Sequence, residues 1–411
     1  MKITKPNVLI IADKEDVKYL DINRRSEHWN IFWYIIDYNK LHKSVDEIQT
    51  QIKKYNIDFI LYSRNDQVAN KISIGPVTRR LNIGYSSFSG IDEKYRIEEM
   101  KNCFEDFIRC NNQLNLDIAP PKERDLKTLG NKGTFSLVFD TEQIGGVRYG
   151  LPRILELLNK YNVKATFFIT NLIKKIYPNV LEEIRAQGHE IGLHGRWHEY
   201  LSNYKIEEQA KLIKEMIEDF GCEINGANFI GRMNVNTVYA LIENKIKYFV
   251  FPLINYYRLF CYPKLSTNPF LVSSENGEIW MIPISVESYG KPWFSIRNMI
   301  DSAFRESLKS NKHIVILCHP FRDGNLQHIK VTEKLLKYLV VEKEMKSVVI
   351  KDLVKSLERQ QINIEKINVD EIDKLNSKVK LKELVPRTKQ DYIGIIPENL
   401  VMIYRLIKKD I

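Results

Sequence analysis

The sequence predicts an α/β protein with two folded parts and a tail. Apolar, strand-like runs alternate with amphipathic helical segments along most of its 411 residues, more than one ordinary domain needs. The alternation stops in residues 115–133, which contain a Pro-Pro pair and two glycines. We therefore expect a small α/β domain at 1–114, a linker at 115–133, a larger α/β domain at 134–360 and a helical, basic tail at 361–411.

The first part has the rhythm of a small parallel sheet of the flavodoxin-like or receiver-like type. No G-x-G-x-x-G follows its first strand, so dinucleotide binding has no support. Its third strand ends in Ser63-Arg64, where a receiver would need a carboxylate. We expect this domain to recognise a substrate or partner, or only to pack. Its predicted strands are 7–13, 30–37, 58–63 and 82–88, and its predicted helices are 44–55 and 92–109.

The second part repeats the βα rhythm, which predicts either an open doubly wound sheet or a barrel. In both architectures the chemistry gathers at the C-terminal ends of the strands. Pro152 marks an early helical position, and Gly188 and Gly221 each follow the end of a helix. Its predicted strands are 134–139, 163–169, 190–194 and 314–318, and its predicted helices are 151–160, 178–186 and 206–220.

Composition limits the classes of partner and compartment. The net charge is +10, but residues 374–411 alone carry nine Lys/Arg against four Asp/Glu, so about half the excess lies in the tail and we expect no nucleic-acid partner. Five cysteines without a C-x-x-C pair fit reduced thiols, and neither a signal peptide nor a membrane-spanning run is recognisable, which predicts a cytoplasmic protein. Residues 397–411 resemble a short basic helix that either contacts an anionic membrane surface or docks on its own protein.

Polar side chains stand where apolar strands of the second part end. Asp140 and Glu142 lie two residues apart, so they can face the same way, as a metal ligand beside a general base or as a solvated strand end. His194 and His198 have a spacing that lets two imidazoles bind one cation, and a carboxylate would complete a two-His, one-carboxylate site.

Two further residues complete the candidate set. Arg232 could orient one of the carboxylates, although an exposed arginine is the plainer interpretation. His319 follows the apolar run 314–318, and Pro320 ends the strand there, which makes His319 a candidate general acid. Cys318 must point to the opposite face, so we interpret it as a core residue.

These stretches, in this order, resemble the polysaccharide deacetylase family, the NodB homology domain of carbohydrate esterase family four. The resemblance runs from about residue 134 to 358 and is most specific in Phe-Asp-Thr-Glu at 139–142, the segments 150–158 and 163–169, and Gly-His-Glu-Ile-Gly-Leu-His at 188–194 with His198. It implies a distorted (β/α) barrel of about seven strands that hydrolyses N-acetyl, or sometimes N-formyl, groups on amino sugars. By position it makes Asp140 the general base, Glu142, His194 and His198 the metal ligands, Arg232 the orienter of Asp140, and His319 the acid.

The sequence also departs from the family pattern. Thr141 separates the two carboxylates, as in an Asp-x-Asp or Asp-x-Glu subgroup, and Glu142 reaches one methylene further than aspartate. The proline usually found within two residues of the arginine is missing after Arg232. In the long stretch before His319, Glu287 could replace the carboxylate that supports the acid histidine, and aromatic residues such as Trp293 could line a sugar site.

The sequence thus predicts a metal-dependent hydrolase that deacetylates or deformylates a cytoplasmic, nucleotide- or lipid-linked amino sugar. Two histidines and a carboxylate suit one divalent ion, zinc first and cobalt, nickel or iron as alternatives. Two other hypotheses remain open at this point. One is a metal-free amide or ureide hydrolase on the same fold, and the other is a non-catalytic carbohydrate-binding relative.

Overall fold

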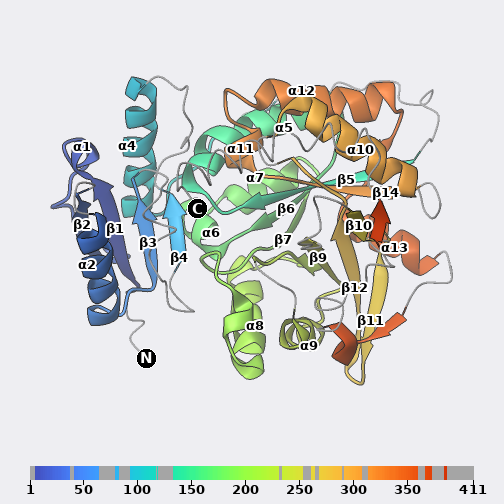
Figure 1. Cartoon of the computed structure of the whole chain (residues 1–411), viewed down its shortest axis with the longest axis horizontal. Coiled ribbons are helices and arrows are strands. Elements are labelled where there is room, and N and C mark those ends of the chain that lie inside the picture. The colour runs from blue at the N-terminus through green and yellow to red at the C-terminus, as the bar shows by residue number, and fades with distance from the viewer. Residues whose placement is uncertain are drawn as a thin grey trace.

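The described parts of the computed structural model contain two main sheets, each built mainly from parallel strands and flanked by helices (Figure 1), and a separate two-stranded sheet. The smaller sheet lies near the N-terminus, and the larger one forms the second part of the chain, as the predicted α/β fold requires. The structure describes residues 5–37, 41–63, 79–82, 93–116, 118, 133–230, 234–252, 261–263, 268–288, 291–307, 313–359, 366–372 and 384–386.

The small sheet has the strand order β2-β1-β3-β4 with parallel pairing throughout. Alternate residues of β1 face opposite sides: Val8 and Ile10 join a core that also includes residues of α4, whereas Leu9 and Ile11 pack in a second cluster with residues of α2. The elements are β1 (Asn7–Asp13), α1 (Lys14–Val17), β2 (Asn30–Ile36), α2 (Leu41–Lys54), β3 (Phe59–Tyr62), β4 (Arg79–Asn82) and α4 (Glu93–Arg109). The strand predicted at 82–88 begins earlier, and residues 83–88 lie outside the described part.

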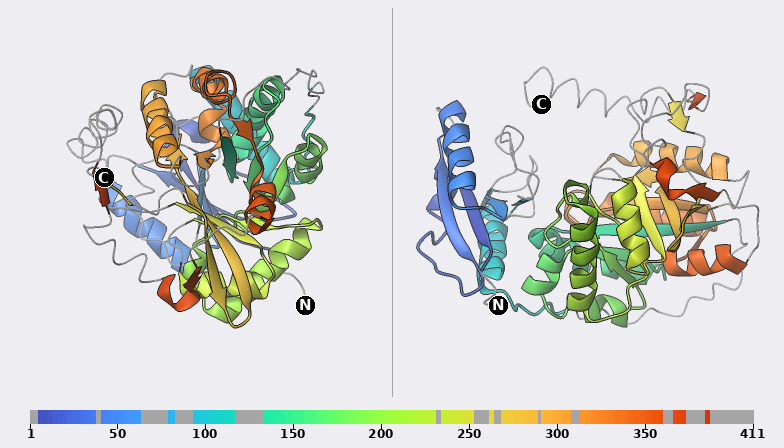
Figure 2. Two further views of the ribbon diagram at one scale, coloured as in Figure 1. Left: turned by 90° about the vertical axis from the view of Figure 1, so that its right-hand side faces the viewer. Right: turned by 90° about the horizontal axis from the view of Figure 1, so that it is seen from below.

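The large sheet has the order β13-β14-β5-β6-β7-β8-β9-β12-β11-β16, with β15 added beside β5. Its pairings are parallel except between β11 and β12, and the sheet curves as in a distorted barrel (Figure 2, left). The barrel-like fold is confirmed; the sheet has eleven strands rather than about seven because β11, β13, β15 and β16 extend it. Its strands are β5 (Thr134–Thr141), β6 (Thr166–Ile169), β7 (Glu190–Leu193), β8 (Gly226–Ala227), β9 (Tyr248–Pro252), β11 (Phe270–Ser274), β12 (Gly277–Ile284), β13 (Val286–Glu287), β14 (His313–Cys318), β15 (Lys346–Ser347) and β16 (Lys366–Asn368).

Helices cover the outside of this sheet because each has one apolar stripe. In α5 the stripe is Leu151, Ile154, Leu155 and Leu158, all buried. Helix α8 ends at Gly221, whose φ of 65° is the left-handed conformation that glycine adopts readily. The helical elements are η3 (Gly146–Gly150), α5 (Leu151–Lys160), α6 (Asn171–Ile176), α7 (Val180–Ala186), η4 (Leu201–Asn203), α8 (Ile206–Phe220), α9 (Val235–Glu243), α10 (Trp293–Ser307), α11 (Pro320–Asp323), α12 (Ile329–Lys337), η5 (Tyr338–Glu342), α13 (Ile350–Arg359) and η6 (Val369–Glu371).

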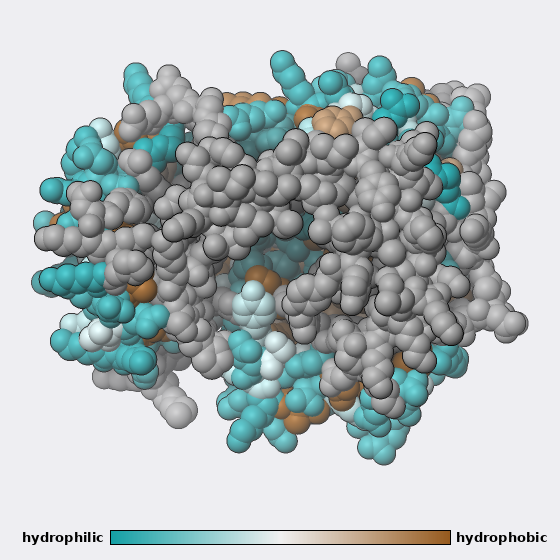
Figure 3. All heavy atoms as spheres, viewed as in Figure 1, coloured by the Kyte–Doolittle hydropathy of each residue, from teal (hydrophilic) through white to brown (hydrophobic). Residues whose placement is uncertain are grey.

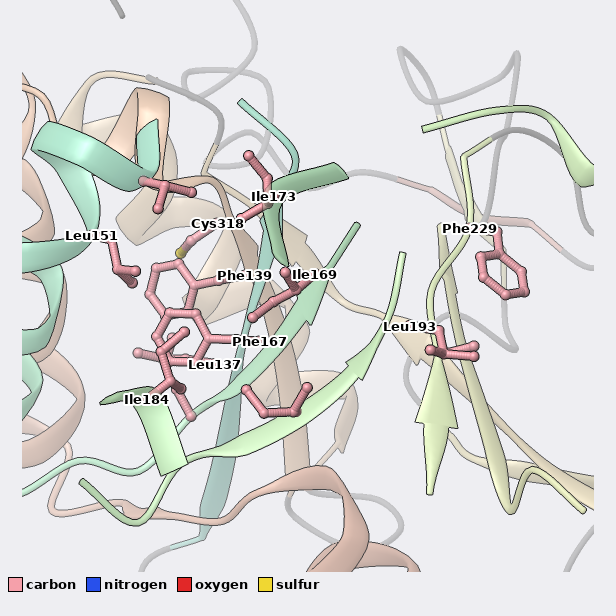
Figure 4. Packing of buried hydrophobic residues seen from close by; sticks show 14 of the residues in the cluster. Leu137, Phe139, Leu151, Phe167, Ile169, Ile173, Ile184, Leu193, Phe229 and Cys318 are labelled. Atoms are coloured by element: carbon pink, nitrogen blue, oxygen red, sulfur yellow. The ribbon is translucent and has the colours of Figure 1, made fainter. Parts of the chain in front are cut away.

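The core between sheet and helices is aromatic and aliphatic (Figure 4). Phe139 and Phe167 on neighbouring strands stack with ring centroids 4.8 Å apart, beside Leu151 and Ile184 from the covering helices. Cys318 belongs to the same cluster. Because side chains alternate along a strand, the residue after Cys318 turns to the other face of the sheet.

The opposite face of the sheet is closed at one end by the start of α13. The buried Glu190 carboxylate accepts hydrogen bonds from the Tyr248 hydroxyl (2.8 Å), the Thr166 hydroxyl (2.8 Å) and the Lys351 main-chain N–H (3.0 Å). The Thr166 hydroxyl also accepts the Ile350 N–H. These contacts lie at the N-terminal ends of β6 and β7, so the C-terminal ends of the strands are left for chemistry.

The two sheets share one core. Helix α4 lies between them in the right-hand view of Figure 2, and Phe104 and Phe107 of α4 belong to the same buried cluster as residues of the large sheet. Asp106 on α4 accepts hydrogen bonds from Arg148 and Tyr177 of the second part, both at 2.5 Å. The predicted boundaries at 114, 133 and 360 remain predictions.

The predicted tail differs from a helix where it is described. Residues of β16 pair with β11 and bury Ile367, and β17 (Leu384–Pro386) pairs with β10 (Cys261–Pro263). The edge of the large sheet at β11 and the separate strand β10 therefore supply main-chain partners that local sequence pattern did not reveal. The segment 397–411 lies outside the described residues.

The surface of the described elements is mostly hydrophilic in the view of Figure 3, with apolar residues in small patches. Large apolar side chains that are exposed occur singly; they are Ile35, Tyr200, Phe294, Leu326 and Val341. Of the helices in the described parts of the chain, none has the length and apolar character needed to cross a bilayer.

Candidate active site

Four strands of the large sheet bring polar side chains to one edge. Asp140 stands near the end of β5, and His194, Asn228 and His319 directly follow β7, β8 and β14. These strands lie near one another in the sheet and run parallel, so their C-terminal ends meet. Asp140 is at the centre: its two carboxylate oxygens lie 3.8 Å from His194 Nδ1 and 3.9 Å from His319 Nε2.

Asp140 is a buried carboxylate, only 7% exposed. Its Oδ1 accepts a hydrogen bond of 2.7 Å from the Asn228 side-chain amide. Burial raises the pKa of Asp140 well above its ordinary value, the charges of Glu142 and Glu287 raise it further, and the Asn228 hydrogen bond opposes this rise. A carboxyl group so placed binds a proton readily, as a general base must.

His194 has the orientation of a metal-binding imidazole. Its Nδ1–H donates to the Asn228 carbonyl oxygen at 2.5 Å, which fixes the tautomer and directs the lone pair of Nε2 away from this bond. Nε2 is buried and has no hydrogen-bond partner among the described residues. Burial lowers the pKa of His194 to about 4, so the imidazole is neutral, as a metal ligand requires.

His198 lies beside His194. The two ring centroids are 4.9 Å apart and the ring planes differ by 35°. His198 is half-buried and has a φ of 71°, in the left-handed region that few non-glycine residues adopt. The two predicted histidine ligands are therefore brought together, and the backbone between them is held in an uncommon conformation.

Glu142 is buried on the same strand end, and its burial favours the protonated carboxyl group. Burial raises the pKa of Glu142 to about 8, and the positive charge of Arg322 acts against this rise. Its Oε2 has no hydrogen-bond partner among the described residues. The histidine pair thus fits a metal ion, whereas the described residues contain no group of three or more His, Cys, Asp or Glu side chains arranged to hold one.

His319 directly precedes the short helix α11, and its main chain is fixed by a hydrogen bond to Asp323. Its main-chain N–H donates to the Asp323 carboxylate at 2.6 Å, and that carboxylate also accepts the Ser288 hydroxyl at 2.8 Å. Burial lowers the pKa of His319 to about 3, helped by His194 and the nearby cations Arg322 and Lys291. The imidazole is therefore neutral in the resting site.

The remaining predicted residues divide into three cases. Arg232 lies outside the described residues, and it is Asn228 that donates to Asp140. Glu287, on β13 beside β14, is close enough for its charge to raise the pKa of Asp140. Trp293 begins α10 and packs edge-on against Tyr338 at 5.4 Å, a contact between covering helical elements.

Comparison with known proteins finds a match to a family model. Residues 128–221, which include Asp140, Glu142, His194 and His198, match the family model described as polysaccharide deacetylase. This matched segment covers 94 of the 411 residues and ends before Asn228 and His319, so the family match leaves out two residues of the cluster.

The relatives that this chain matches are distant. A peptidoglycan-N-acetylglucosamine deacetylase of Bacillus cereus is 33% identical over 79 residues, which are 19% of this chain and 27% of that protein. The match therefore spans about a quarter of the curated relative's length. A structure described as a putative polysaccharide deacetylase from Mycobacterium smegmatis is 18% identical and covers 62% of this chain and 98% of its own, with a TM-score of 0.48. One from Pseudomonas aeruginosa is 17% identical and covers 58% and 99%, with a TM-score of 0.47.

Proposed function

We propose that this chain is a metal-dependent hydrolase that removes an N-acetyl, or N-formyl, group from an amino sugar. The observation that carries the proposal is the cluster around Asp140, a buried carboxyl group less than 4 Å from a ring nitrogen of each of two neutral histidines. A base and an acid on either side of one position are what amide hydrolysis needs. The match of this segment to the deacetylase family supports the same reaction.

The metal would be held by His194 and His198, with Glu142 as the third protein ligand. The Asn228 carbonyl supports this assignment, since metal-binding histidines commonly donate their other ring N–H to a carbonyl or carboxylate. A divalent ion, zinc first and cobalt, nickel or iron as alternatives, supplies Lewis-acid polarisation of the amide carbonyl. The proton transfers are carried out by side chains of the protein itself.

Asp140 takes the proton of the attacking water, and His319 protonates the departing amine. His319 is neutral at rest because burial lowers its pKa to about 3, so it must receive a proton before it donates one. Asp140 Oδ2 lies 3.9 Å from His319 Nε2, so Asp140 can pass to His319 the proton that it takes from the water. Once protonated, a histidine of so low a pKa is a strong acid, which favours transfer to the amine.

The substrate is an N-acylated amino sugar in our proposal. The relatives from Bacillus cereus are described as acting on the N-acetylglucosamine of peptidoglycan. For this chain we propose a nucleotide- or lipid-linked precursor, because the sequence predicts a cytoplasmic protein. We propose that Glu287, whose charge acts on Asp140, contacts the sugar from the β13 side.

The test is release of acetate from an N-acetylated chito-oligosaccharide and from a nucleotide-linked N-acetyl amino sugar. Asp140→Asn keeps the shape and removes the base, so kcat should fall by at least about a hundredfold. Asp219→Asn makes the same chemical change at an exposed ion pair with Lys174 and should leave kcat unchanged. Full turnover by the Asp140 variant would refute the proposed role of the cluster.

A metal-free amide hydrolase on the same fold is the second candidate. It is favoured by the environment of Glu142, which feels the charge of Arg322 and is not part of any three-residue metal cluster within the described residues. The two candidates differ in one measurement. Turnover that survives exhaustive chelation would support the metal-free reaction, and turnover restored only by added zinc would support the metal-dependent one.

A further inference from the structure

The loop that carries His198 is fixed by main-chain contacts on two sides. The carbonyl oxygens of Gly195 and Arg196 accept the N–H groups of Asn171 (3.1 Å) and Leu172 (2.8 Å) at the start of α6. The N–H groups of Arg196 and Trp197 point the other way and donate to the Glu199 carboxylate at 3.0 and 2.6 Å. The segment between the two histidines therefore has a single well-defined path.

Glu199 acts as the internal brace of this loop. Its side chain is buried and also accepts the Arg196 Nε–H at 3.3 Å. Gly195, with a φ of 88°, passes so close that an added Cβ would lie 3.2 Å from the Glu199 carboxylate. His198, with a φ of 71°, holds a conformation that costs a non-glycine residue free energy and persists only where the surroundings enforce it.

Trp197 ties the same loop to the N-terminal domain. Its ring stacks on Phe59 of β3 with centroids 5.5 Å apart and planes within 19°, and it meets Trp29 edge-on at 6.3 Å. Trp29 in turn stacks on Phe107 of α4 at 5.0 Å and donates its indole N–H to the Phe107 carbonyl at 2.9 Å. A residue next to His198 is thus inserted into an aromatic cluster built by the other sheet.

The packing beside this contact is open. A cavity of about 470 Å³ borders the aromatic contact where the first sheet meets the loop. Arg196 and Trp197 of the loop line it together with residues of the N-terminal part, among them Asn30 and Asp58.

We propose that the N-terminal domain is a positioning element of the metal site, with Trp197 as the positioning residue. Phe59 and Trp29 hold the Trp197 ring, and the Trp197 backbone, braced by Glu199, fixes the left-handed conformation from which His198 binds the metal. The proposal rests on the proposed metal-dependent function. It also gives the N-terminal domain a role in catalysis that needs no ligand of its own.

The test is the zinc affinity of the full chain, measured by competition with a chelating dye. Substitution of residues that support metal ligands typically lowers metal affinity by 10- to 100-fold. Trp197→Ala should therefore weaken zinc binding by at least about tenfold. Phe59→Ala removes the partner ring in the same stack and should also lower the zinc affinity. Trp197→Phe keeps an aromatic ring and should bind zinc within about threefold of the unsubstituted chain. The double variant of Phe59 and Trp197 should be no worse than Trp197→Ala alone, because both changes remove one interaction.

Phe32→Ala is the matched control. Phe32 stacks on Tyr55 at 4.3 Å in the cluster on the opposite side of the same sheet, away from Trp197. It should lower the Tm and leave zinc affinity unchanged. Zinc affinity unchanged in Trp197→Ala and Phe59→Ala, or lowered equally by Phe32→Ala, would overturn the positioning role. An unsubstituted chain that binds no zinc would overturn the proposed function itself, and the positioning role with it.

Discussion

Replacing Asn228 by alanine should move the pH dependence of the reaction to higher pH. The Asn228 side chain donates the 2.7 Å hydrogen bond to Asp140, whereas the carbonyl that accepts from His194 belongs to its main chain. The substitution therefore removes the support of the base and keeps the support of the metal ligand. Because the hydrogen bond favours the ionised carboxylate, its loss raises the pKa of Asp140.

The size of the shift follows from the burial of the pair. A hydrogen bond to a charged group contributes about 1.5–3 kcal/mol, and one pKa unit corresponds to about 1.4 kcal/mol, so the pKa of Asp140 should rise by about 1–2 units. A general base works only when ionised, so the acid limb of the kcat/KM profile should move up by the same amount. Below that limb the Asn228→Ala variant should be about 10- to 100-fold slower than the unsubstituted chain.

The assay is acetate release between pH 5 and 10 with zinc content measured in parallel. Asn244→Ala is the control: Asn244 follows α9, outside the site, and donates to the main-chain carbonyls of Ala210 in α8 and Ala240 in α9, both at 2.9 Å. It should lower the Tm and leave the pH profile in place. A profile that stays where it was in Asn228→Ala, or moves to lower pH, would refute the role of this hydrogen bond.

Three further predictions concern stability. Burial lowers the pKa of His313 to about 3, so His313 stays neutral in the folded state, whereas in the unfolded chain its pKa is near 6.5. Because the unfolded chain binds the proton first, the free energy of unfolding should fall as the pH drops below 6.5, by about 2 kcal/mol at pH 5. The Tm of His313→Gln should therefore fall less between pH 7 and pH 5 than the Tm of the unsubstituted chain. Equal losses would contradict this. A Cβ at Gly226 would lie 2.0 Å from the buried Tyr248 ring, so Gly226→Ala should destabilise by about 1–3 kcal/mol or more in urea unfolding; an unchanged midpoint would mean that the ring can move. The Tyr177 hydroxyl donates to buried Asp106 at 2.5 Å, so Tyr177→Phe should cost about 1.5–3 kcal/mol, and unchanged thermal unfolding would show that the bond contributes nothing.

Elements fixed by local pattern were predicted well. The predicted helices 151–160 and 206–220 coincide with α5 and α8, and the first strand with β1. In each helix the apolar stripe and the residue that ends it are close in sequence, so neither depends on distant contacts. The β11–β12 hairpin was missed although Asn276-Gly277 between two apolar runs is a recognisable turn signal.

The candidate site was predicted in part. Asp140, His194, His198 and His319 meet at one edge because parallel strands end there, which is a rule that sequence can use. Asn228 was missed because β8 has only two residues and leaves little strand pattern. Asn228 is nevertheless the first polar side chain after that strand, which is a usable signal for a site residue.

The remaining features depend on contacts that no local pattern contains. The left-handed φ of His198 is enforced by its surroundings, among them the brace at Glu199. The contact of Trp197 with Trp29 and Phe59 joins residues more than a hundred positions apart. The aromatic character of all three residues predicts that they are buried, but it does not predict which residues they contact.

The central claim is a metal site formed by His194 and His198 in a hydrolase. The most direct measurement is elemental analysis of the purified chain beside a His194→Ala/His198→Ala double variant, each offered zinc and then dialysed. We expect about one divalent ion per chain, lost in the variant. No bound metal in either protein, or equal amounts in both, would contradict the account.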